Sequence, residues 1–141
     1  MEGRHVYILT AVQILAALAL FWLLITFRGP WNWQRDLGTV LVVAGVGFIV
    51  LARFQLGRSF SIAPEARKLV TAGLYSKIRN PIYVFGAVLI AGVILVIQRP
   101  GLWIIFFIVV VGQVIRARRE ARVLEAAFGE DYREYRRKTW F

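Results

Sequence analysis

Long apolar runs dominate the chain, and short polar segments separate them. The first run extends from Val6 to Phe27 without a charged residue, which is long enough for a helix to cross a hydrocarbon core of roughly 30 Å. The second run extends from Leu37 to Ala52. We therefore predict membrane-spanning helices over about residues 6–27 and 37–54.

Two further apolar runs lie almost back to back later in the chain. They extend from Ile82 to Ile97 and from Leu102 to Ile115, and only Gln98–Gly101 separates them. Because that separator contains Pro-Gly, a strong turn signal, we expect a tight antiparallel helix hairpin. The predicted spans are about 82–98 and 101–116.

The last part of the chain, residues 117–141, is strongly charged but keeps a helical spacing of apolar residues. Gly129 divides it at a position where a helix commonly ends. We expect the fourth helix to continue into the cytoplasm and then to fold back as an amphipathic helix along the membrane surface.

The positions of the cations give the orientation. Four spans place the N-terminus, the loop 55–81 and the tail 117–141 on one side. Together with Arg53 and Arg116, at the adjoining ends of two spans, this side holds 15 of the 18 Lys and Arg residues. The positive-inside rule makes this side cytoplasmic. We predict an all-α, multi-pass membrane protein with both termini in the cytoplasm and a single domain over residues 1–141.

Composition agrees with this topology. Hydrophobic residues make up 59% of the chain and the mean hydropathy is +0.63, above the usual content of a soluble domain. The topology explains the formal charge of +10, so we expect no nucleic-acid partner. The chain has no cysteine, which excludes disulfides and thiol chemistry, and we expect no metal site. Gly38, Gly45 and Gly47 would allow another helix to approach closely, so a homo-oligomer is one prediction.

Two polar segments flank the predicted hairpin at its cytoplasmic end. The first reads Arg-Lys-Leu-Val-Thr-Ala-Gly-Leu-Tyr over residues 67–75 and Arg-Asn-Pro-Ile-Tyr over residues 79–83. The second reads Arg-Ala-Arg-Arg-Glu over residues 116–120, and Phe128-Gly-Glu-Asp-Tyr and Tyr135 follow it. The hairpin would bring both segments to one face of the membrane.

These segments resemble the two signatures of the integral-membrane methyltransferases that include isoprenylcysteine carboxyl methyltransferase and the phospholipid N-methyltransferases. In that family the first looks like L-V-T-x-G-x-Y followed by R-[HN]-P-x-Y, and the second like R-x-x-x-E with an F-G-x-x-Y-x-x-Y tail. The resemblance covers about residues 57–138. It implies S-adenosylmethionine bound at the cytoplasmic membrane surface and a lipid or other membrane-soluble methyl acceptor that reaches it from the bilayer.

Carried over position by position, the resemblance assigns the cofactor contacts to Arg67, Lys68, Leu69, Val70, Tyr75, Asn80, Pro81, Ile82, Tyr83 and Glu120. It places Arg116 toward the acceptor, so Arg116 and Glu120 are the candidate catalytic residues. Glu120 can pair with the cofactor's ammonium and Arg67 or Lys68 with its carboxylate. The tyrosines offer ring faces to the sulfonium or the adenine.

Three positions depart from the family pattern. Asn80 stands where the isoprenylcysteine branch has His, whereas the phosphatidylethanolamine branch also has Asn-Pro. Ala121 replaces the second Glu of an acidic pair, and Gly86 follows Tyr83 by three residues where the family's Gly follows by two. The acceptor can therefore be a carboxylate, an amine or a thiol.

Two other functions stay open at this point. A non-catalytic membrane module that binds anionic lipid or a partner helix would also carry juxtamembrane arginines, and Arg116 with Glu120 would then be a helix-supporting pair. The C-terminal halves of membrane sterol reductases look similar around R-x-P-x-Y and the tyrosine tail, which would imply NADPH as the cofactor.

Overall fold

A computed structural model describes residues 2–57 and 69–141, with the backbone alone for residues 2–10. Every regular element in the described part is helical, as predicted, and no strand occurs there. The elements are α1 Glu2–Thr26, α2 Trp33–Leu56, the 3₁₀ helix η2 Gly73–Ser76, α3 Pro81–Ile97, α4 Leu102–Phe128 and α5 Glu130–Lys138.

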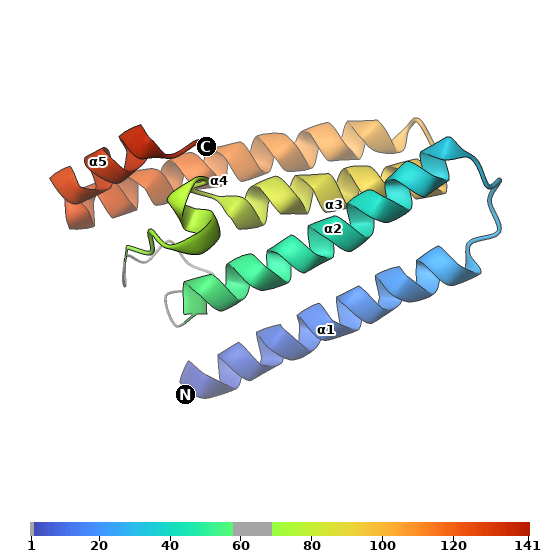
Figure 1. Cartoon of the computed structure of the whole chain (residues 1–141), viewed down its shortest axis with the longest axis horizontal. Helices are drawn as coiled ribbons and strands as arrows, with labels where there is room; N and C mark the ends of the chain where they lie inside the picture. The colour runs from blue at the N-terminus through green and yellow to red at the C-terminus, as the bar shows by residue number, and fades with distance from the viewer. Residues whose placement is uncertain (1, 58–68) are drawn as a thin grey trace.

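The four long helices lie alongside one another, and their connections define two ends (Figure 1). The turn end holds the connection between α1 and α2 and the turn between α3 and α4. The motif end holds η2, the start of α3, the last turns of α4, and α5, which folds back against α4 (Figure 1). Both predicted polar segments therefore belong to the motif end.

The helix α2 packs against α3 with its backbone almost in contact. A Cβ atom built on Gly38 would lie 2.7 Å from the carbonyl oxygen of Gly92, and one built on Gly45 would lie 3.0 Å from Leu89 Cβ. Such distances leave no room for a side chain, so the close approach predicted for these glycines occurs within the chain. Gly47 has no neighbour within 4 Å among the described residues.

The helix α2 begins at Trp33, about one turn before the apolar span that we predict from Leu37. Asn32 is the N-cap, and its Oδ1 accepts a hydrogen bond of 3.2 Å from the backbone N–H of Arg35. A side-chain oxygen at this position satisfies a donor that the helix itself cannot. The polar residues before Leu37 obscured this start because prediction followed the apolar run alone.

Arg35 is the buried cation of the turn end, with 4% of its surface exposed. Its guanidinium donates to the carbonyl oxygens of Phe27 and Gly29 at 2.7 and 2.8 Å. It also lies 4.2 Å from the ring centroid of Trp31. Helix C-termini leave carbonyls without partners, so Arg35 ties the end of α1 to the start of α2.

The predicted hairpin between the third and fourth apolar runs is confirmed, since α3 ends at Ile97 and α4 begins at Leu102. Gln98 takes a left-handed conformation with φ of 58°. Its side-chain amide exchanges two hydrogen bonds of 3.1 Å with that of Asn32. This pair joins both connections of the turn end.

The helix α4 continues without interruption to Phe128, and Gly129 with φ of +53° separates it from α5. A positive φ suits glycine at a helix end, so the predicted break at Gly129 is confirmed. Among the described residues, α2 is long and apolar enough to cross a membrane, while Ala11–Thr26 and Pro81–Ile97 are shorter apolar helices. The four spans and the single domain stay predictions.

Candidate active site

The two motif segments meet at the start of α3 and at the part of α4 that follows its apolar half. The Tyr83 hydroxyl, on α3, donates a hydrogen bond of 2.6 Å to Oε1 of Glu120, on α4. Arg116 Nε donates to the same oxygen at 3.1 Å. The Arg116 guanidinium carbon also lies 6.0 Å from the centroid of the Tyr83 ring. Three of the residues singled out from the sequence therefore form one cluster.

Local sequence explains why these side chains converge. Arg116 and Glu120 are four residues apart, so they project from the same face of α4. Pro81 occupies the first turn of α3, where a residue without an N–H costs the helix nothing. Pro81 is also fully buried, which fixes the start of α3 and with it the position of Tyr83.

The side chains of the cluster are partly exposed. The Arg116 side chain is 47% exposed and that of Glu120 is 24% exposed. An ion pair closed on itself in the interior would be inaccessible, whereas this carboxylate can exchange a hydrogen bond with a bound molecule. The arrangement is therefore suited to binding a cation beside a phenol and a guanidinium.

Four tyrosines belong to elements of the motif end: Tyr75 in η2, Tyr83 in α3, and Tyr132 and Tyr135 in α5. Tyr75 is buried in η2. Burial raises the pKa of Tyr75 well above its ordinary value, and electrostatic interactions with Tyr135 and with the Glu120 carboxylate add to this effect. The pKa of Tyr132 is raised too, chiefly by burial, while the charges of Arg79 and Arg136 oppose the shift. Glu120 is thus hydrogen-bonded to Tyr83 and lies within electrostatic range of Tyr75 and Tyr132.

Asn80 stands at the predicted N-cap position of α3, but its side chain makes no capping hydrogen bond. Its backbone N–H instead donates to the carbonyl oxygen of Phe141 at 2.9 Å. Of the other predicted cofactor contacts, Leu69, Val70 and Ile82 are half-buried. Arg67 and Lys68 lie outside the described residues.

The C-terminal segment holds the first motif in place through backbone contacts that the sequence did not predict. The Tyr135 hydroxyl donates a buried hydrogen bond of 2.7 Å to the Tyr75 carbonyl oxygen. The Trp140 N–H donates to the Lys77 carbonyl at 2.7 Å, and the Arg79 N–H donates to the Trp140 carbonyl at 2.9 Å. We call this set of contacts, between residues 75–80 and 135–141, the C-terminal clasp.

Gln55, at the end of α2, supports the same segment from the other side. Its Oε1 accepts a hydrogen bond of 2.7 Å from the backbone N–H of Leu74. Gly73 has φ of +62°, and a Cβ atom there would lie 2.4 Å from Gln55 Cδ. Only glycine fits this position, which explains the Gly of the first motif. Sequence reasoning gave no role to Gln55 because its partner is 19 residues away.

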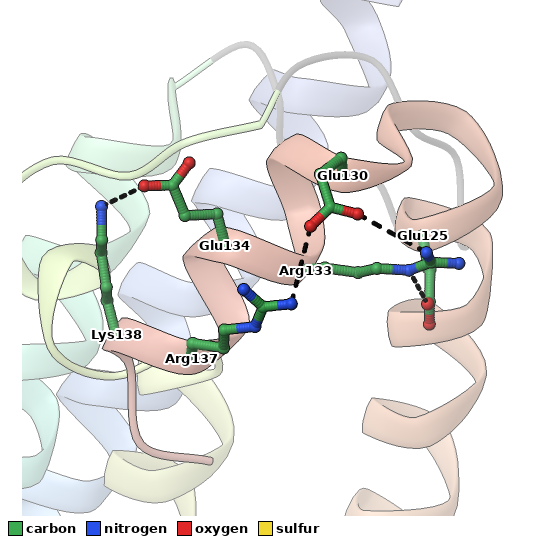
Figure 2. Close-up of polar contacts among 6 residues, drawn as sticks. All are labelled: Glu125, Glu130, Arg133, Glu134, Arg137 and Lys138. Atoms are coloured by element: carbon green, nitrogen blue, oxygen red, sulfur yellow. Dashed lines mark hydrogen bonds and ion pairs between the residues drawn. The ribbon is translucent and has the colours of Figure 1, made fainter.

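Exposed ion pairs join α5 to α4 and stabilise its turns (Figure 2). Arg133 Nε lies 2.8 Å from Glu125 Oε1 on α4, and Lys138 pairs with Glu134 within α5. Lys138 lowers the pKa of the Glu134 carboxyl below its usual range. Exposed pairs contribute little each because solvent screens them, so the buried hydrogen bond from Tyr135 to the Tyr75 carbonyl is the stronger contact of α5.

The bundle also contains an apolar cavity, toward the turn end. An open apolar cavity of about 400 Å³ lies between α1, α3 and α4, lined by residues such as Leu20, Leu89, Val93, Ile97 and Leu102. It presents almost no polar surface, so it has no group that could bind a charged cofactor. The Tyr83–Arg116–Glu120 cluster is therefore the candidate site.

Comparison with known proteins agrees with this choice. Residues 33–131 match the family model of phospholipid methyltransferase, a span that contains α2, α3, α4 and both motif segments except Tyr132 and Tyr135 of the tail. A search of curated proteins and a search of solved structures each gave no match. Because the family match covers well over half of the chain, the protein belongs to the phospholipid methyltransferase family, a group of membrane-associated methyltransferases.

Proposed function

We propose that the protein transfers a methyl group from S-adenosylmethionine to a lipid or other membrane-soluble acceptor at the cytoplasmic membrane surface. One observation carries the proposal: Glu120 accepts hydrogen bonds from both Tyr83 and Arg116, which joins the two motif segments in one partly exposed site. Family membership supports the reaction class.

The residues at the site fit the groups of the proposed cofactor. Glu120 is a carboxylate open to ligands and would pair with the cofactor's ammonium. Tyr83 beside it, with Tyr75 close behind, would place aromatic surface near a sulfonium or an adenine. The Asn80 side chain makes no capping bond and would supply an amide donor. The cofactor, when bound, would supply an electrophilic methyl group.

Catalysis at such a site would depend mainly on positioning and on exclusion of water. Arg116 reaches from the same helix face as Glu120 and would hold an anionic group of the acceptor. A carboxylate acceptor needs no base, whereas an amine must first lose a proton. Glu120 would accept that proton, because it is the carboxylate of the cluster.

The membrane arrangement is the second part of the proposal. Large apolar side chains are exposed on three of the long helices, among them Leu15 and Trp22 on α1, Val43 on α2, and Ile104 and Phe107 on α4. Contiguous apolar surface of this kind is unfavourable in water, and lipid would cover it. Four spans would then set the motif end at the cytoplasmic surface, where the positive-inside rule puts its cations.

A ligand titration tests the reaction class. Purified protein in detergent should bind S-adenosylmethionine and its demethylated product, and Glu120→Ala should abolish that binding. Glu134→Ala is the matched control, because Glu134 is exposed on α5 and pairs with Lys138 away from the cluster. Binding of NADPH in their place would favour the reductase alternative, and binding of neither ligand would favour a non-catalytic lipid-binding module.

A further inference from the structure

The outer face of α4 changes from apolar to basic along its length. Positions 104, 108, 111, 115, 118 and 122 recur at alternating steps of four and three, so they lie on one face of the helix. The first four positions hold exposed apolar residues, namely Ile104, Ile108, Val111 and Ile115. The next two hold the exposed residues Arg118 and Arg122, and the exposed Arg119 lies beside them. One helix face thus passes directly from apolar to cationic.

This face is not the face of α4 that carries the proposed active site. Glu120 meets Tyr83 of α3 there, and the neighbouring Ala117 is buried. Arg118 and Arg122 each stand two residues from Glu120, one before it and one after it. At 3.6 residues per turn, both are turned about 160° away from Glu120 around the helix. They therefore point away from the proposed acceptor.

The three arginines of the outer face have no partner within the part of the chain that the structure describes, residues 2–57 and 69–141. None of them makes a hydrogen bond or an ion pair there. The cations of α5 differ, because Arg133, Arg137 and Lys138 each pair with a glutamate (Figure 2). Arg122 follows the other two by three and four residues, and like charges at these spacings repel one another. An anion bound among them would relieve that repulsion.

The depth of these arginines along α4 indicates where that anion lies. The step from Arg118 to Arg122 covers about 6 Å along the helix axis, and the headgroup layer on each side of a bilayer is about 5–7 Å thick. With the preceding apolar stripe among acyl chains, the guanidiniums would lie among lipid phosphates. Guanidinium groups bind phosphate through paired, charge-assisted hydrogen bonds. A phospholipid offers apolar surface and phosphate in this same order, whereas a nucleic acid does not.

We propose that Arg118, Arg119 and Arg122 bind the headgroup of an anionic phospholipid on the outer face of α4, apart from the proposed active site. Net-negative lipid is favoured because no ammonium of its own headgroup offsets the phosphate. The bound lipid is a ligand and not the methyl acceptor. It would hold at a fixed depth the segment of α4 that carries Arg116 and Glu120. The inference rests on the proposed membrane arrangement and not on methyl transfer.

The test compares phosphatidylglycerol with phosphatidylcholine of the same acyl chains. Native mass spectrometry of the purified full chain in detergent gives the affinity for the first bound lipid. The wild type should favour phosphatidylglycerol at least about tenfold, since each cation near an anionic headgroup contributes about fivefold. The combined substitution Arg118→Gln, Arg119→Gln and Arg122→Gln should abolish the preference. Arg122→Gln alone, a milder change, should lower the phosphatidylglycerol affinity about threefold to fivefold.

The matched control removes the same number of charges from α5, through Arg133→Gln, Arg137→Gln and Lys138→Gln together. It should keep the preference, because these cations are already paired with glutamates. Equal wild-type affinity for the two lipids would overturn the inference. So would a preference that survives the combined substitution on α4, or one that is lost equally in the α5 control.

Two further measurements exclude other occupants. Glycerol 3-phosphate at the same concentration should not displace phosphatidylglycerol, and displacement would contradict a lipid-binding surface. Arg116→Gln should keep the preference, because Arg116 lies over the Tyr83 ring of α3. Loss of the preference in that variant would put the anionic lipid in the proposed active site and overturn the inference. Neither measurement requires methyl transfer, so a failure of the proposed reaction leaves this test unchanged.

Discussion

The two ends of the helix bundle contain similar polar residues but use them differently. At the turn end, Arg35 caps backbone carbonyls of the α1–α2 connection and Asn32 pairs with Gln98. At the motif end, Arg116 and Glu120 form a pair that remains partly exposed. The arginine of the turn end is 4% exposed as a residue, whereas the side chain of Arg116 is 47% exposed.

This difference separates stabilising polar groups from ligand-binding ones. Polar groups that satisfy one another in the interior fix the positions of helices, and removal of one leaves its partner unsatisfied. Polar groups that converge on an accessible carboxylate can instead exchange partners when a ligand arrives. We therefore expect substitutions at the turn end to lower stability and substitutions at the motif end to lower activity.

The largest expected effect is the loss of activity in Glu120→Gln. Gln keeps the size of the side chain and can still accept the Tyr83 hydrogen bond, but it removes the charge that would bind an ammonium. We expect kcat/KM for methyl transfer to fall by roughly tenfold to a hundredfold, since charge-assisted hydrogen bonds contribute roughly 1.5–3 kcal/mol. The thermal midpoint in detergent should change little. If the variant had normal activity and a lower thermal midpoint, Glu120 would stabilise the fold as the polar residues of the turn end do. That result would contradict the expected difference between the two ends.

Arg35→Leu makes the opposite test at the turn end. The substitution removes charged donors from the carbonyls of Phe27 and Gly29 and leaves those oxygens unpaired. We expect a loss of about 2–3 kcal/mol in the free energy of unfolding, measured by denaturation in mixed micelles. The fraction that remains folded should bind S-adenosylmethionine with wild-type affinity. Loss of cofactor affinity without loss of stability would contradict the division between the ends.

Gly38→Ala tests whether the contact between α2 and α3 is as tight as the distances indicate. The new Cβ would lie 2.7 Å from the Gly92 carbonyl oxygen, so the helices must separate, at an expected cost of about 1–3 kcal/mol. Gly47→Ala is the matched control, because nothing lies within 4 Å of that position among the described residues. If Gly47→Ala instead alters the oligomeric state, the homo-oligomer predicted from the sequence gains support.

Elements that depend on local sequence were predictable. Apolar runs indicated the long helices, Gly129 marked the break before α5, and Pro81 marked the first turn of α3. The placement of both motif segments at one end of the bundle could also be predicted, from the order of the helices and the tight hairpin. These signals lie within a few residues of the feature that they determine.

Features that depend on distant partners could not be predicted. The burial of Arg35 depends on backbone carbonyls that the preceding turn brings to it. The Tyr135–Tyr75 hydrogen bond joins residues 60 positions apart. The isolated β-bridge between Ile78 and Trp140 joins two residues that belong to no recognisable sequence pattern. Hydrophobic periodicity carries no information on such contacts.

The smallest expected effect concerns the C-terminal clasp, which belongs to the motif end but acts by position rather than by ligand contact. Tyr135→Phe removes the hydroxyl that donates to the Tyr75 carbonyl and leaves the ring in place. We expect KM for S-adenosylmethionine to rise about threefold to tenfold with little change in kcat, since one neutral hydrogen bond contributes roughly 0.5–1.5 kcal/mol. Ser76→Ala, which removes an exposed hydroxyl from the same segment, should leave KM unchanged.

The alkaline stability of the protein provides a second readout of the same hydroxyl. Burial raises the pKa of Tyr135 from the ordinary value of 10.0 to about 12. Between these values the folded chain keeps a proton that the unfolded chain has lost, so this contribution is fully present below pH 10 and is lost as pH rises through 12. Tyr135→Phe should therefore show a shallower fall in unfolding free energy over this range. An identical pH profile in the variant would mean that the Tyr135 hydroxyl is not buried in the clasp, and the first motif would then be held by backbone contacts alone.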